Sequence, residues 1–215
     1  METWLRANTR FILDPVVSAL AKLGVAPNTL TLLGLLLNVL AGILMGFGYV
    51  QWGAVVMTCM AMPLDALDGA LARATHSMSK FGAFFDSTLD RIAEAALLIG
   101  LVALFLQRGD TLSVLGSFGA LVGSFMVSYT RARAEGLGLE CKVGLFSRTG
   151  RFVLLAIGLI LNLPVITVWL LAILSAATAI QRMVHVYRLT RRGWIDARHD
   201  GDVVADPIAE LNQRK

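Results

Sequence analysis

The sequence predicts an all-α integral membrane protein with six transmembrane helices, preceded by an N-terminal amphipathic helix at the membrane interface. Of its 215 residues, 56% are hydrophobic and only 16% are charged. The mean hydropathy is +0.69, far above the usual range of a soluble globular domain. The apolar residues also fall into long runs separated by short polar segments, which is the pattern of successive membrane spans.

The interfacial helix is expected over residues 1–24. This segment mixes large apolar side chains with Arg6, Arg10 and other basic residues. Asp14-Pro15 supplies a cap and a first-turn proline for a helical piece. Such a composition is typical of an amphipathic helix that lies in the plane of the membrane surface.

The first two spans are expected over residues 29–48 and from about residue 52 to residue 73. Asn28 is a candidate N-cap for the first of them, and the free N–H groups of that turn would favour a negative ligand. A plain cap without any ligand explains Asn28 equally well. The second span is wholly apolar up to Leu64 and then carries polar residues at its far end.

Four more spans are expected at about residues 80–106, 112–133, 149–162 and 165–187, the third of these being short. Gly119-xxx-Gly123 lies in the second of these four. This spacing lets two helices approach closely, and it fits internal packing as well as it fits a dimer seam.

Basic residues indicate the topology. They concentrate before the first span, between the second and third, between the fourth and fifth, and after the sixth, whereas the opposite side has only Arg108. The positive-inside bias therefore predicts a multi-pass protein of the cell (plasma) membrane with both termini in the cytoplasm. The expected division is an interfacial helix at 1–24, a six-helix domain at 25–193 and a polar cytoplasmic tail at 194–215. Nucleic acid is not an expected partner, because the basic residues form no patch interleaved with aromatic residues.

Four acids stand at or inside the ends of the second and third spans, namely Asp65, Asp68, Asp86 and Asp90. A carboxylate in hydrocarbon is costly unless it is paired, faces a wet cavity or binds a cation. Spacings of three and four residues place each pair on one face of its helix. Oxygen ligands without His or Cys suit Mg²⁺, Mn²⁺ or Ca²⁺. Mutual salt bridges or snorkelling are the alternative explanation for any one of these acids.

The complete pattern reads Asp65-x2-Asp68-Gly69-x2-Ala72-Arg73-x8-Gly82-x3-Asp86-x3-Asp90. It resembles the signature of the CDP-alcohol phosphotransferases, also called class I CDP-alcohol phosphatidyltransferases, and all eight defining positions match at the family's spacing. The resemblance implies transfer of the phosphatidyl group of a CDP-linked lipid, such as CDP-diacylglycerol, to an alcohol with release of CMP. The acidic motif and the active site would then face the cytoplasm.

The resemblance also implies roles for individual residues. The four aspartates would be metal ligands for Mg²⁺ or Mn²⁺, two ions per active site, and Asp90 would also be the catalytic base that takes the acceptor's proton. The residues expected to bind the CDP-lipid are Asn28, Thr29, Leu30, Thr31, Asp65, Asp68, Gly69, Arg73 and Ser79. Relatives are commonly homodimers, so the resemblance implies a homodimer surrounded by membrane lipids.

A second stretch, from Ser128 to Glu135, bears on the acceptor, because it resembles the corresponding stretch of prokaryotic phosphatidylinositol-phosphate synthases. We expect the acceptor's phosphate to bind Ser128, Arg131, Arg148 and Arg182, since arginine forms charge-assisted hydrogen bonds with phosphate. The positive-inside bias alone would also put arginines in this loop. Arg182 is harder to explain that way, because it follows a mostly apolar run.

The sequence therefore predicts synthesis of phosphatidylinositol phosphate from CDP-diacylglycerol and the phosphorylated polyol inositol 1-phosphate. Phosphatidylglycerophosphate synthase, or another member of the family, is the alternative. A cation transporter is a distant alternative, because intramembrane acids also occur in transporters. Ion passage does not, however, require the framework of Gly69, Ala72, Arg73 and Gly82.

Overall fold

The computed structural model describes residues 14–199, with side chains as far as residue 191. Every regular element in this part of the chain is a helix, so the prediction of an all-α protein is confirmed. A helix over residues 14–22 comes first. Residues 1–13 of the expected interfacial helix lie outside the described residues, and its position at a membrane surface stays a prediction.

Helix α2 spans Pro27–Gly46, and the residue before it is Ala26, with no side chain capping the first turn. The expectation that Asn28 is the N-cap is therefore wrong. Pro27 takes the first helical position because its fixed φ and missing N–H suit a place where the N–H would have no partner. Asn28 consequently lies inside the first turn.

The next span runs over Val50–Ala74 and is made of α3 (Val50–Val56), a π-helical segment (Met57–Ala61) and α4 (Met62–Ala74). The π-helical segment is explained by Pro63, which follows it closely. A proline inside a helix cannot donate the usual i→i−4 hydrogen bond, and its ring pushes on the preceding turn.

The π-helical segment also separates two apolar cores. Before it, Val50 and Ala54 pack in the main core with residues of α2, α5, α7 and α8. After it, Leu67 and Leu71 pack with Val17 and Leu30 in a smaller core. The acidic end of this span thus rests on α2 and on the helix over residues 14–22.

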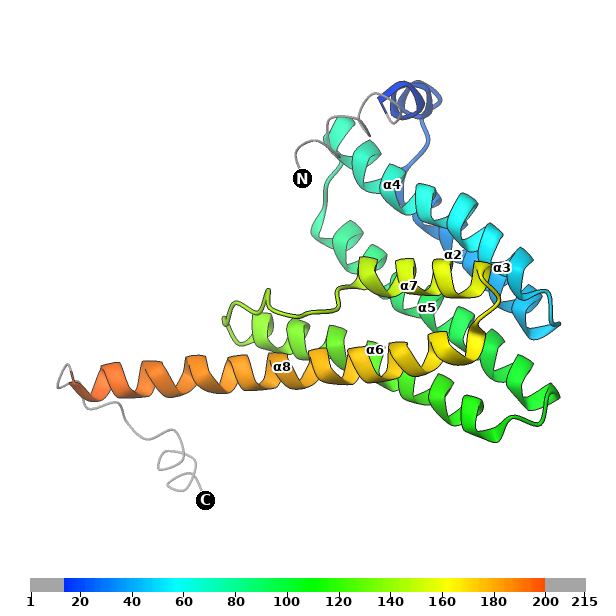
Figure 1. Ribbon diagram of the computed structural model, residues 1–215. Helices are drawn as coiled ribbons and strands as arrows, with labels where there is room; N and C mark the ends of the chain where they lie inside the picture. Colours follow the sequence, from blue (N-terminus) through cyan, green and yellow to red (C-terminus); the bar gives the residue numbers. More distant parts are fainter. Residues whose placement is uncertain (1–13, 200–215) are drawn as a thin grey trace, which may run out of the picture.

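The remaining helices are α5 (Lys80–Gln107), α6 (Thr111–Gly136), α7 (Arg148–Ile160) and α8 (Pro164–His199). In Figure 1, α8 runs beside α6 along the lower edge of the bundle, while α2, α4 and the start of α5 lie above. Because α8 continues to His199, the expected boundary of the polar tail at residue 194 falls inside a helix.

Glycines permit close helix contacts at two crossings, of α5 with α2 and of α6 with α8. A Cβ on Gly100 of α5 would lie 2.1 Å from the backbone oxygen of Gly42 on α2, so this crossing requires glycine. A Cβ on Gly123 of α6 would lie 2.9 Å from the Ser175 Cβ of α8. The Gly119-xxx-Gly123 pattern therefore serves packing within the chain, and the homodimer stays a prediction.

Four helical segments in the described residues are long and apolar enough to cross a membrane: Pro27–Gly46, Val50–Ala74, Thr111–Gly136 and Pro164–Arg191. These identify an integral membrane protein. Helix α5 has 28 residues but carries charged side chains in its first half, and α7 has only 13. The six expected segments are all helical, and the number that cross the membrane stays a prediction.

Candidate functional site

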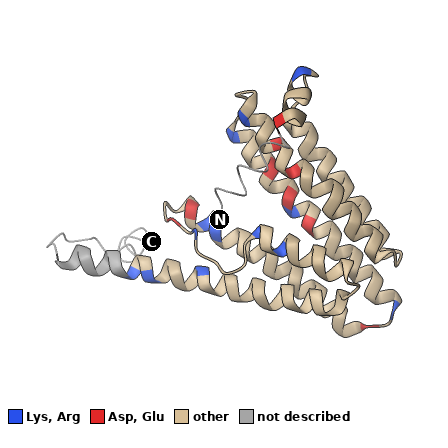
Figure 2. Ribbon diagram, turned by 45° about the horizontal axis from the view of Figure 1, so that its top comes forward, with Lys and Arg blue, Asp and Glu red and all other residues tan. Residues whose placement is uncertain are grey.

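Three of the four aspartates lie close together, one from α4 and two from α5. Figure 2 shows the acidic segments of these two helices near one another. One carboxylate oxygen from each of Asp65, Asp86 and Asp90 lies within 4.8 Å of the other two. Oxygen ligands of a hard cation stand about 2.0–2.6 Å from it, so two of them are at most about 5 Å apart. The three carboxylates therefore fit one divalent cation.

Asp68 lies beside this group and makes a different contact. Its Oδ2 accepts a hydrogen bond of 2.8 Å from the Thr31 hydroxyl of α2. The side chain is buried, and it lines one cavity with Asp65 and Asp90 and a second with Asp86. The hydrogen bond joins α2 to the acidic end of α4. Its role as a metal ligand stays a prediction.

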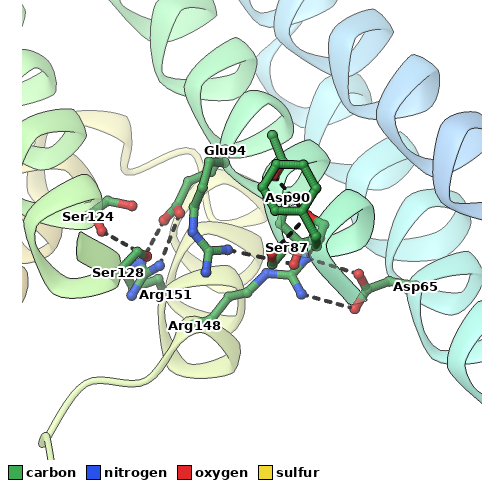
Figure 3. A network of polar contacts seen from close by, with 11 residues as sticks. Asp65, Ser87, Asp90, Glu94, Ser124, Ser128, Arg148 and Arg151 are labelled. Carbon is green, nitrogen blue, oxygen red and sulfur yellow. Dashed lines mark hydrogen bonds and ion pairs between the residues drawn. The ribbon is translucent and has the colours of Figure 1, made fainter. Parts of the chain in front are cut away.

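An arginine already contacts the acidic group. Arg148, the first residue of α7, places Nη2 2.9 Å from the Asp65 Oδ1 and also forms an ion pair with Asp90, as Figure 3 shows. Its guanidinium stands 5.2 Å from the centre of the Phe152 ring. The Arg91 Nη1 is 3.6 Å from the other oxygen of Asp90. The structure thus brings Arg148, expected at the acceptor, directly to the aspartates.

Two cavities adjoin the aspartates. The smaller has a volume of about 80 Å³ and is lined by Leu30, Thr31, Asp65, Asp68, Asp90 and Arg148, among others. The larger has a volume of about 420 Å³ and is lined by Asn28, Thr31, Asp68, Gly69, Arg73, Ser79, Gly82 and Asp86, among others. Every residue expected to bind the CDP-lipid lines one of these cavities, except Thr29.

Glycine and serine shape the wall of the larger cavity. Ser79 caps α5, where its Oγ accepts a hydrogen bond of 2.9 Å from the Gly82 backbone N–H. A Cβ on Gly82 would lie 3.1 Å from that Oγ. A side chain at residue 82 would thus crowd both the cap and the cavity, which explains a glycine at this position.

The other residues expected at the acceptor do not contact the aspartates. Ser128 donates a hydrogen bond to the Ser124 carbonyl at 3.2 Å, and Arg131 pairs with Glu135 at 2.8 Å. Arg182 is buried and donates to the backbone carbonyls of residues 127 and 143. None of the three lines either of the two cavities. Arg148 is therefore the member of this set that reaches the acidic group.

The sequence reading missed a buried ion pair next to this group. Glu94 and Arg151 are 2% and 1% exposed, and two hydrogen bonds of 2.6 and 3.0 Å join them. Glu94 follows Asp90 by one helical turn on α5, and Arg151 follows Arg148 by one turn on α7. Two features of the sequence could have indicated this pair. Glu94 lies four residues after Asp90, and Arg151 lies three residues after Arg148, so each shares a helix face with a residue of the acidic site.

Known proteins resemble this chain along most of its length. The sequence model of the CDP-alcohol phosphatidyltransferase family matches residues 24–181. An archaetidylinositol phosphate synthase of Pyrococcus horikoshii is 40% identical over 189 residues, covering 87% of this chain and 96% of the relative. A phosphatidylinositol phosphate synthase of Mycobacteroides abscessus is 37% identical over 212 residues, covering 94% of each chain.

Solved structures give the same result. A phosphatidylinositol phosphate synthase of Mycobacterium tuberculosis with CDP-DAG bound has a TM-score of 0.76 at 31% identity, covering 82% of this chain and 94% of that one. The same enzyme in complex with manganese and citrate has a TM-score of 0.75. Sequence and fold agree, and the chain belongs to the CDP-alcohol phosphatidyltransferase family.

Proposed function

We propose that this protein transfers the phosphatidyl group of CDP-diacylglycerol to inositol 1-phosphate, giving phosphatidylinositol phosphate and CMP. The observation that carries this proposal is the 420 Å³ cavity beside the aspartates, lined by residues of α2, α4 and α5. A nucleotide in this cavity would have its diphosphate next to the carboxylates. The inositol phosphate synthases among the relatives, and the CDP-DAG in one structural neighbour, support this donor and this acceptor.

The aspartates would hold two divalent cations, Mg²⁺ or Mn²⁺. Bound cations would offset the charge of the diphosphate and stabilise an in-line displacement at phosphorus. The spacing of the carboxylates of Asp65, Asp86 and Asp90 supports one such site, and Asp68 would complete the second. The manganese-containing neighbour supports the same class of ion.

The chain's own residues would position the donor. The first turn of α2 carries the positive end of the helix dipole, so it favours an anionic group. Asn28 and Thr31 present their side chains there. Gly69 and Gly82 leave room for the nucleotide, and Arg73 would contact the diphosphate.

Asp90 would accept the proton of the attacking hydroxyl. This residue lines the smaller cavity, lies within reach of Asp65 and Asp86, and is mostly buried. As the new bond between the acceptor oxygen and phosphorus forms, the bond between that phosphorus and the bridging diphosphate oxygen breaks. CMP then leaves with that oxygen.

The acceptor's phosphate would bind arginines on the α6, α7 and α8 side. Arg148 comes from α7, Arg131 and Ser128 from α6, and Arg182 from α8. These cationic and hydroxyl groups are donors that suit a phosphate. Arg148 supports the proposal most directly, because it lies beside Asp90 and would hold the acceptor's hydroxyl close to it.

The test is an acceptor panel. The purified protein is incubated with CDP-diacylglycerol, Mg²⁺ and inositol 1-phosphate, inositol or glycerol 3-phosphate, and CMP release is measured. We expect inositol 1-phosphate to be the preferred acceptor. Preference for glycerol 3-phosphate would instead support phosphatidylglycerophosphate synthesis. If no acceptor gives CMP and the protein carries cations into vesicles, the alternative of a cation transporter would be supported.

The lipid tail of the donor is a separate question. Repeating the assay with a CDP-linked archaeal ether lipid in place of CDP-diacylglycerol tests which tail the protein prefers.

The orientation is proposed from the basic loops. In a variant without native cysteines, a cysteine at residue 77 should label only from the cytoplasmic side of the cell membrane. A cysteine at residue 51 should label from outside. The reverse labelling would contradict a cytoplasmic active site.

A further inference from the structure

Arg148 stands where a cation would be expected. The carboxylates of Asp65 and Asp90 lie on different helices and repel each other when both are ionised. The Arg148 guanidinium contacts both of them, and it comes from a third helix. It therefore joins α4, α5 and α7 through ion pairs and hydrogen bonds.

The contacts use the same atoms that a metal ion needs. Asp65, Asp86 and Asp90 fit one hard cation by the separation of their oxygens, and two of these three acids are the ones that bind Arg148. A carboxylate oxygen directed at a guanidinium is a poorer ligand, because the arginine competes for its lone pairs. A divalent cation brings twice the charge in a smaller volume, so it attracts the same acids more strongly.

The neighbouring pair of Glu94 and Arg151 provides a comparison, because its arginine is fixed in place. Arg151 is fully buried and bonds both oxygens of Glu94, which belongs to no acidic group. The Arg148 side chain is 30% exposed, whereas that of Arg151 is 1% exposed. Arg148 thus has room to move that Arg151 lacks.

We propose that Arg148 is an internal counter-ion that divalent cations displace from Asp65 and Asp90, and that the displaced guanidinium then binds the phosphate of the acceptor. Metal and acceptor would therefore bind cooperatively. Metal releases Arg148 for the acceptor, and an acceptor that holds Arg148 leaves the carboxylates free for metal. Such coupling is reciprocal by necessity. The second half of this proposal rests on the proposed function, whereas the first half does not.

The first experiment measures Mn²⁺ binding by electron paramagnetic resonance, with the protein in detergent and without any substrate. Arg148→Gln should bind Mn²⁺ more tightly than the wild type, by roughly fivefold, as expected for loss of a competing ion pair of modest strength. Arg108→Gln is the matched control. It removes the same charge about 27 Å from Asp90, since residue 108 follows Asp90 by 18 residues along α5 at about 1.5 Å per residue. Its Mn²⁺ affinity should equal that of the wild type.

A purely structural arginine would give the opposite result. Removing it would splay the carboxylates apart, and Mn²⁺ would bind Arg148→Gln equally well or more weakly than the wild type. Either result overturns the proposal. Arg148→Lys guards against a folding defect in Arg148→Gln. Lysine keeps the charge but is a point donor that lacks the planar fork, so its Mn²⁺ affinity should lie between those of the wild type and Arg148→Gln.

The second experiment tests the coupling. Binding of inositol 1-phosphate is measured by calorimetry with and without Mn²⁺. The wild type should bind it at least several-fold more tightly with Mn²⁺, and Arg148→Gln should lose that gain. An equal gain in both proteins would overturn the coupling. If inositol 1-phosphate does not bind at all while the Mn²⁺ affinities differ as expected, the proposed function fails and the internal counter-ion stands.

Discussion

The two sides of the acidic group differ in how their polar side chains are satisfied. On the side of α2, α4 and α5, carboxylates, amides and hydroxyls line two cavities. On the side of α6 and α8, Ser128 and Arg182 donate to backbone carbonyls, and Arg131 pairs with Glu135 of its own helix. The first side presents several carboxylates to two cavities, whereas on the second side the polar groups are held by backbone carbonyls or by a neighbour on the same helix.

This difference suggests different tasks for the two sides. Several carboxylates gathered beside cavities of a membrane protein are costly, so they are explained best by a charged ligand that binds there. An arginine that already holds carbonyl oxygens stabilises the fold as well, and a ligand gains less from it. Substitutions on the first side should therefore change chemistry, and those on the second should change both stability and acceptor binding.

Metal removal should have the largest effect. Treatment with EDTA should reduce CMP release to background, because carboxylates without a cation repel the diphosphate. Added Mg²⁺ or Mn²⁺ should restore activity, which distinguishes this loss from unfolding. Full CMP release in EDTA without added metal would contradict the proposed metal site.

The substitution Asp90→Asn should have the second largest effect on activity. Because the amide cannot accept the hydroxyl's proton as a carboxylate can, we expect the turnover to fall by about 10²–10⁴-fold. CDP-lipid binding should fall only moderately, since the remaining acids still hold at least one cation. Asp110→Asn is the matched control, because Asp110 only caps α6, and its turnover should stay normal. Near-normal turnover of Asp90→Asn would exclude Asp90 as the base.

The buried Glu94–Arg151 pair lies between the two sides, and breaking it should lower the stability of the protein. Glu94→Gln leaves the Arg151 charge uncompensated, and we expect a loss of about 3–5 kcal/mol in the free energy of unfolding. The double variant Glu94→Leu with Arg151→Met removes both charges and should recover most of that loss. Denaturation in detergent measures both. If the double variant is as unstable as the single one, packing around the pair matters more than its charge.

The same contrast explains what the sequence could predict. Asp65 and Asp68, and Asp86 and Asp90, are neighbours on single helices, so helical spacing alone groups each pair. The short connection between α4 and α5 then brings the pairs together. The partner of Arg148 depends on how α7 docks, which no local spacing reveals. The Asn28 cap failed because Pro27 competed for the start of α2, and the Glu94–Arg151 pair exists only through tertiary packing.

The smallest effects are expected for two arginines of the acceptor side, Arg182 and Arg131, and they should differ between the two. Arg182→Ala removes a charge-assisted donor, of about 1.5–3 kcal/mol in general, and should raise the KM for the acceptor about tenfold with little change for the CDP-lipid. It should also lower the melting temperature, because the carbonyls of residues 127 and 143 lose their hydrogen bonds from Arg182. Arg131→Ala should leave the melting temperature nearly unchanged, since exposed ion pairs contribute about 0–1 kcal/mol.

The two readouts together decide what Arg182 does. A lower melting temperature with an unchanged KM for the acceptor would make Arg182 a structural residue and leave the phosphate to Arg148 and Arg131. A higher KM for the CDP-lipid would assign Arg182 to the diphosphate instead. If both arginine variants raise the KM for inositol 1-phosphate but not for unphosphorylated inositol, the phosphate is what they bind. That result requires Arg182 to exchange a backbone carbonyl for a ligand oxygen, which is the exchange we expect on this side of the acidic group.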